Sequence, residues 1–166
     1  MRNRGPGTRN QEGGAPGGGR GFRALLAWQK ADELASGVYR TLGSAPERHR
    51  WLTVQAMRAA ISVPANIAEG YGRGSLGDYL RFLDIARGSL AELEYYLHFI
   101  GREGLASDSD VVALQGLRDE AGKLLHGLWR SLKQKARNGT WDRSGQVREA
   151  EISYEADPAP ADGGPP

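Results

Sequence analysis

The chain has 166 residues and a mass of 18.0 kDa, a size that accommodates one domain with additional tails. It contains no cysteine, which excludes disulfides, thiolate metal sites and cysteine nucleophiles. No apolar run approaches the ~18 residues of a membrane span, and no hydrophobic stretch follows the N-terminus. We therefore expect a cytoplasmic protein without a membrane partner.

Charge and glycine are unevenly distributed along the chain. The net charge of +2 combines four Arg against one Glu in residues 1–21 with two Arg against six acids in residues 138–166. These two segments also hold 12 of the 24 glycines. Such a composition cannot bury enough apolar surface to offset the chain entropy lost on folding. We predict a disordered Gly/Arg-rich tail over 1–21, one domain over 22–137 and a mostly disordered acidic tail over 138–166.

Four segments between the tails place apolar residues at alternating spacings of three and four, the period of an amphipathic helix. The predicted helices cover about 22–42, 45–69, 76–102 and 108–137. The third, for example, aligns Tyr79, Phe82, Ala86, Ser89, Leu93, Tyr96 and Ile100 on one face. No comparable stretch alternates with period two, and short connections force sequential helices to run antiparallel. We predict an all-α, antiparallel up-down-up-down four-helix bundle.

Helix boundaries are predicted from capping residues. A serine followed three residues later by an acid marks three helix starts, at Ser44 with Glu47, Ser75 with Asp78 and Ser107 with Asp110. Glycine marks three helix ends, at Gly43, Gly70 and Gly104. Inside the second helix, Pro64 removes one amide hydrogen, so we expect a kink or a restart there.

Known catalytic and metal-binding patterns are missing from the sequence. Residues 72–77 match GxGxxG, but a dinucleotide fold needs that turn between a strand and a helix. Arg73, beside the free amides of the third helix, could instead hold one phosphate. The three histidines, His49, His98 and His126, lie in different segments without a helical His pair. We predict no catalytic residue, no metal site and no cofactor.

Polar residues flank the proline of the second helix and recur on the third. They are Gln55, Arg58, Asn66, Glu69, Ser89 and Glu92. Buried polar groups must be paired, because an unpaired one costs roughly 1–3 kcal/mol. We interpret the set as a structural polar cluster that fixes the helix register. A ligand or partner site is the alternative.

The fourth helix carries the best candidate functional surface. His126, Arg130, Lys133 and Arg137 form a stripe, with Lys123 and Lys135 nearby and Trp129 adjoining. Basic residues at a helix C-terminus also stabilise the helix dipole. A rod of positive charge with an aromatic side chain suits a phosphate backbone. Together with Arg73, these residues are our candidate nucleic-acid-binding set.

Three runs of sequence point to a known family. They are LAWQKA at 26–31, QAMRAAISVPANIAEGYGR at 55–73 and FLDIARGSLAELE at 82–94. The chain resembles the bacterial four-helix-bundle proteins encoded in intervening sequences of 23S rRNA genes, which are related to the accessory protein of diversity-generating retroelements. The resemblance implies a ring-like homopentamer for which no catalytic activity is established and nucleic-acid binding is the usual proposal. The retroelement relatives also bind a reverse transcriptase.

These observations lead to one expected function. We expect a non-enzymatic, homo-oligomeric bundle that presents basic surfaces to RNA, DNA or a nucleoprotein partner such as a reverse transcriptase. One alternative is a protein–protein adaptor without direct nucleic-acid contact. A bundle that binds a small ligand near Pro64 is the other.

Overall fold

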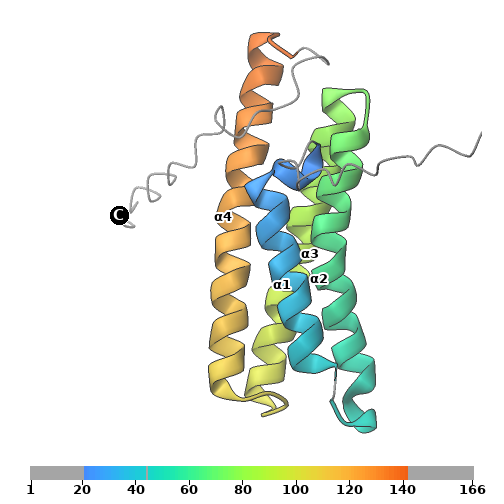
Figure 1. Cartoon of the computed structure of the whole chain (residues 1–166), viewed down its shortest axis with the longest axis vertical. Coiled ribbons are helices and arrows are strands. Elements are labelled where there is room, and N and C mark those ends of the chain that lie inside the picture. Colours follow the sequence, from blue (N-terminus) through green and yellow to red (C-terminus); the bar gives the residue numbers. More distant parts are fainter. Residues whose placement is uncertain (1–20, 44, 142–166) are drawn as a thin grey trace, which may run out of the picture.

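The computed structural model describes residues 21–43 and 45–141, and four α-helices account for most of them. The helices are α1 (Leu26–Leu42), α2 (Arg50–Gly72), α3 (Leu76–Arg102) and α4 (Asp108–Asn138). Two short 3-10 helices, η1 (Phe22–Ala24) and η2 (Glu47–His49), precede α1 and α2, and no described residue lies in a strand. Figure 1 shows the four helices running alternately up and down. The predicted antiparallel four-helix bundle is confirmed.

Each helix packs against two others around one apolar core: α1 and α3 both contact α2 and α4. The core is built mainly from leucine and alanine; α1, α3 and α4 contribute wholly buried leucines, and α2 contributes the wholly buried Ile67. The leucines include Leu34 on α1, Leu83 and Leu97 on α3, and Leu128 on α4. Trp141 packs against this core from just beyond α4.

Two of the three predicted serine caps are confirmed. The Ser75 hydroxyl oxygen accepts a hydrogen bond from the amide of Asp78 at 3.0 Å, and Ser107 accepts one from the amide of Asp110 at 3.1 Å. In both cases the serine hydroxyl donates to the carboxylate three residues on. These contacts satisfy amides at the start of α3 and α4 that have no partner within the helix.

The predicted start of the second helix is wrong. Ser44 lies outside the described residues, and Glu47 belongs to the 3-10 turn η2. The α-helical backbone begins only at Arg50, because His49, at φ −106° and ψ 1°, interrupts the helical geometry. α2 then continues without a break through Pro64, so the helix does not restart at the proline.

Gly70 does not end the second helix as predicted, since α2 runs to Gly72. Its role is close packing. A β-carbon built on Gly70 would lie 2.7 Å from Cδ2 of Tyr79 and 2.9 Å from Cβ of Phe82, both on α3. Gly43 and Gly104 do follow the ends of α1 and α3, and Gly104 has a φ of +63° that favours glycine.

Two cross-helix ion pairs connect α4 to its neighbours. Lys30 on α1 reaches Glu120 on α4 at 3.3 Å and also Glu33 at 3.0 Å. Hydrogen bonds to Glu33 and then Glu120 raise the pKa of Lys30 above its ordinary value. Arg118 on α4 pairs with Glu94 on α3. Both pairs lie near the middle of α4.

None of the described helices is both long enough and apolar enough to cross a bilayer.

We expect Gly70→Ala to destabilise the fold by about 1–3 kcal/mol, because the added methyl group overpacks the contact with Tyr79 and Phe82. Gly116→Ala is the matched control: Gly116 lies inside α4, and its β-carbon would meet nothing within 4 Å. That variant should be more stable by about 0.5–1 kcal/mol. Urea unfolding followed by circular dichroism measures both. Equal effects of the two substitutions would contradict the packing role of Gly70.

Candidate functional site

Positive charge is concentrated on one half of the bundle, the half at which α1 begins and α4 ends (Figure 1). We call residues 21–34, 62–88 and 124–141 the basic half. It carries nine Lys or Arg and five Asp or Glu, whereas the other described residues carry seven and eight. The excess positive charge of the described chain therefore lies entirely on this half.

The predicted basic residues of the fourth helix all lie on α4, within residues 121–138, a segment that contains no acid. The stripe spacing of three and four holds because the segment is helical throughout. Of the predicted set, Lys123, Lys133 and Arg137 are exposed. The half-buried ones are His126, Arg130 and Lys135.

An aromatic–cation cluster lies at the junction of α3 and α4 in the basic half. The Lys133 ammonium is 4.2 Å from the centroid of the Trp129 ring, and the Arg87 guanidinium carbon is 4.7 Å from the same centroid. The His126 ring stacks on Trp129 with centroids 5.9 Å apart and an angle of 25°. We call these four residues the Trp129 cluster.

Arg87 was not predicted as a site residue. It comes from α3 and also pairs with Asp84 at 3.2 Å. The signal that could have found it is the register of the α3–α4 hairpin. The short connection, like the Arg118–Glu94 pair, places the N-terminal half of α3 beside the C-terminal half of α4.

Arg73 lies apart from the α4 stripe, at the connection between α2 and α3. Its guanidinium pairs with Glu69 and lies over the Phe82 ring, 4.8 Å from the centroid. The neighbouring start of α3 is capped by Ser75, which accepts the amide of Asp78. Arg73 therefore lies in the basic half, but its guanidinium already contacts the nearby Glu69 and Phe82.

The predicted polar cluster is only partly joined. Asn66 donates to the carbonyl and hydroxyl oxygens of Ser62 at 2.7 and 2.9 Å, and the Ser62 and Ser89 hydroxyls are 2.8 Å apart. Ser89 in turn donates to the Ile85 carbonyl at 3.1 Å. Because the proton of Ser89 points to Ile85, Ser62 donates to Ser89. One chain of hydrogen bonds thus crosses from α2 to α3, through a serine that the sequence did not single out.

The other members of the predicted cluster do not join this chain. Glu69 pairs with Arg73 on the surface, and Glu92 accepts a hydrogen bond from the Tyr96 hydroxyl at 3.1 Å. Burial, followed by this contact, raises the pKa of Tyr96, while nearby Arg58 opposes the shift. Gln55 is half-buried on α2, and Arg58 is exposed. The predicted set therefore divides into a part-buried chain across the seam and residues that do not join it.

Most of the exposed large apolar side chains lie on α2 and α3. Within the described ranges, eight large apolar side chains are exposed, and five of them lie on these two helices. They are Trp51, Val54, Ile61, Ile85 and Tyr95, which we call the α2–α3 face. Trp51 is 65% exposed and Ile61 53%. The sequence signal was available: α2 carries apolar residues outside its core stripe, and a helix with more than one apolar face needs a second partner.

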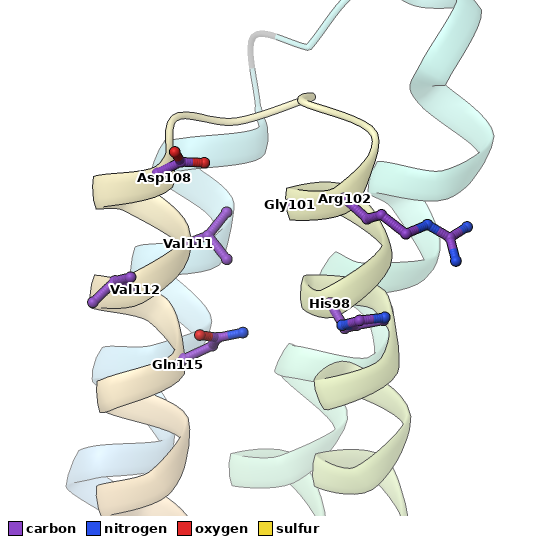
Figure 2. A pocket seen from close by; sticks show the side chains of 7 residues that line it. All are labelled: His98, Gly101, Arg102, Asp108, Val111, Val112 and Gln115. Atoms are coloured by element: carbon purple, nitrogen blue, oxygen red, sulfur yellow. The ribbon is translucent and has the colours of Figure 1, made fainter.

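A shallow groove of about 330 Å³ lies at the opposite end of α4, between its first turns and the last turns of α3 (Figure 2). It is lined by His98, Gly101, Arg102, Asp108, Val111, Val112 and Gln115. In Figure 2 the Arg102 side chain points away from α4. Among the described residues, no group of three or more His, Asp or Glu is placed to hold a metal ion. The groove is separate from the basic half.

Residues 23–127 match the model of a family described as 23S rRNA-intervening sequence protein. The chain belongs to this family. A crystal structure from Bacteroides thetaiotaomicron, described as a protein of unknown function from the S23 ribosomal protein family, has the same fold with a TM-score of 0.58. It is 24% identical, and the alignment covers 63% of this chain and 98% of that one. No curated protein matches this sequence. Trp129 and the basic residues that follow it lie beyond the family match.

We expect the hydroxyl pair across the α2–α3 seam to be energetically coupled. A double-mutant cycle of Ser62→Ala and Ser89→Ala should give a coupling of about 0.5–1.5 kcal/mol, the net worth of a part-buried hydrogen bond. In the coupling energy, the effect of alanine's helix propensity on stability cancels. Glu69→Gln, which alters only a surface pair, should change stability by less than about 1 kcal/mol. Urea unfolding measures each variant. A coupling near zero would show that the chain of hydrogen bonds does not stabilise the seam.

Proposed function

We propose that the protein is a non-enzymatic homo-oligomer that binds RNA or DNA through the basic half of its bundle. The observation that carries this proposal is the acid-free segment 121–138 of α4, which presents five Lys or Arg, four of them in the basic half. Polyanionic backbones bind such surfaces by releasing condensed counterions, without reading sequence. The description of the family refers to an intervening sequence of 23S rRNA, which is consistent with a nucleic-acid context.

Stabilisation of the helix dipole does not account for all of this charge. The dipole effect falls off within the last turn of a helix, where α4 places Lys135 and Arg137. Lys123, Arg130 and Lys133 lie further back along α4. Their positive charge therefore calls for a further explanation, and a bound polyanion provides one.

Self-association is the second part of the proposal, with a second copy of the chain as the occupant of the α2–α3 face. Five large apolar side chains are exposed on this packed helix pair, and exposed apolar surface of this kind marks an interaction site in soluble proteins. The face also carries Arg58 and Glu92, one charge of each sign, so two copies can pair opposite charges around their apolar contacts. Five copies would agree with the number that the family resemblance implies.

Assembly would strengthen nucleic-acid binding. Each copy contributes one basic half, and several weak phosphate-binding surfaces on one particle bind a long polyanion far more tightly than one surface does. The two parts of the proposal therefore act together, with the apolar face building the particle and the basic halves contacting the ligand.

We expect nucleic-acid affinity to fall steeply with salt and to depend on the end of α4. Lys133→Ala combined with Arg137→Ala should lower the slope of log affinity against log salt by about 1–2, since each contact contributes ~0.7–0.9. Arg40→Ala combined with Arg48→Ala removes the same charge from the other half and should leave the slope nearly unchanged. Filter binding over a salt series provides the measurement. An equal loss in both double variants, or no binding of the wild type at low salt, would refute the proposal.

We expect the wild type to have a mass several times 18.0 kDa by light scattering at micromolar concentration. Ile61→Glu places a charge on the α2–α3 face and should shift the mass toward 18.0 kDa. Val112→Glu is the matched control, because Val112 is 66% exposed on α4, away from this face. A monomeric wild type, or equal masses for the two variants, would argue against the proposed interface.

A protein–protein adaptor is the alternative, favoured by the same α2–α3 face. In that case a different protein, such as a reverse transcriptase, would occupy the face. A monomeric wild type that binds no nucleic acid at low salt would favour this function over the one proposed.

A further inference from the structure

The Trp129 cluster points to a more specific ligand than a polyanion. We propose that Trp129 stacks on an unpaired base of a single-stranded nucleic acid, while Arg87 and Lys133 bind the adjoining phosphates. This inference rests on the proposed function and deepens it, because it names the form of nucleic acid that the basic half selects.

The geometry of the cluster provides the first argument. Lys133 and Arg87 lie 4.2 and 4.7 Å from the same ring centroid, so the two cationic groups are no more than about 9 Å apart. They come from different helices, α4 and α3, and the ring is held at the junction of the two. A base that contacts this ring therefore has two phosphate-binding groups beside it.

The burial of Trp129 provides the second argument. The indole is half-buried and packs against the apolar core, which fixes its position. The groups over its ring include two long cationic side chains that are themselves exposed. Such side chains can move aside without repacking the core. Base–aromatic stacking is stronger than an exposed cation–π contact, so a base can take the place of a cation while the cation moves to a phosphate.

The stacking chemistry decides between single and double strands. In a duplex the faces of the bases are covered by their neighbours, so the protein contacts mainly the backbone. An unpaired base exposes its face to an aromatic ring, and every base has such a face, so no sequence preference is required. His126 stacks on Trp129 at an angle of 25° and so helps to hold the indole in place.

The test compares an unstructured single-stranded RNA with a blunt duplex RNA of the same length, using fluorescence anisotropy and the full chain. We expect Trp129→Leu to weaken single-strand binding about tenfold, the range for loss of one stacked base being about 5- to 150-fold. Duplex binding should change by less than about twofold. Trp129→Phe, which keeps a ring, should restore most of the single-strand affinity. Tyr39→Leu, which removes an exposed aromatic ring from the other half, is the control and should change neither affinity.

The ratio of the two affinities is measured on one protein sample, so a partly unfolded variant changes both affinities equally and leaves the ratio intact. Wild-type binding with an unchanged ratio in Trp129→Leu would overturn the stacking inference and leave the proposed function standing. Absence of wild-type binding to either RNA at low salt would overturn both. A ratio that falls in Trp129→Leu and recovers in Trp129→Phe would establish the inference.

Discussion

The close contact of α2 with α3 is the interaction on which the other features of the bundle depend. Gly70 allows the helices to approach at one end, and the hydrogen bonds from Asn66 through Ser62 to Ser89 cross the seam further along. With the inner sides of both helices committed to the core, their remaining apolar side chains are left on the outside as the α2–α3 face. The same packing orients α3 so that its opposite side carries Arg87 to Trp129 on α4. Both candidate surfaces thus follow from one helix pair.

The spacing of the apolar residues and the short connections were sufficient to predict the four-helix bundle, the antiparallel order of its helices and most of its core residues. The predicted apolar face of the third helix did not include Leu83 and Leu97, although both are wholly buried on α3. A helix inside a four-helix bundle buries a stripe that is wider than one line of residues. Gly70 was misassigned because a glycine that ends a helix and one that admits a neighbouring helix are alike in sequence. Only the position of Tyr79 distinguishes them.

The candidate site was less predictable than the fold for a related reason. Spacing along α4 located the basic stripe, since one helix defines its own face. The Trp129 cluster combines residues from two helices, so Arg87 could be assigned to it only once the packing of α3 on α4 was known. The polar cluster divided because Glu69 and Glu92 each have a partner four residues further along the chain, and a local pair satisfies such a group without reaching across the seam.

The uneven charge of the bundle also has a kinetic consequence. A rod that is positive at one end and near neutral at the other is turned by the field of a polyanion while it is still diffusing toward it. Collisions then occur preferentially with the positive end leading, so a larger fraction of encounters has the orientation that allows binding. Ions in solution shorten the range of this guidance, so ionic strength governs how fast complexes form more than how long they last.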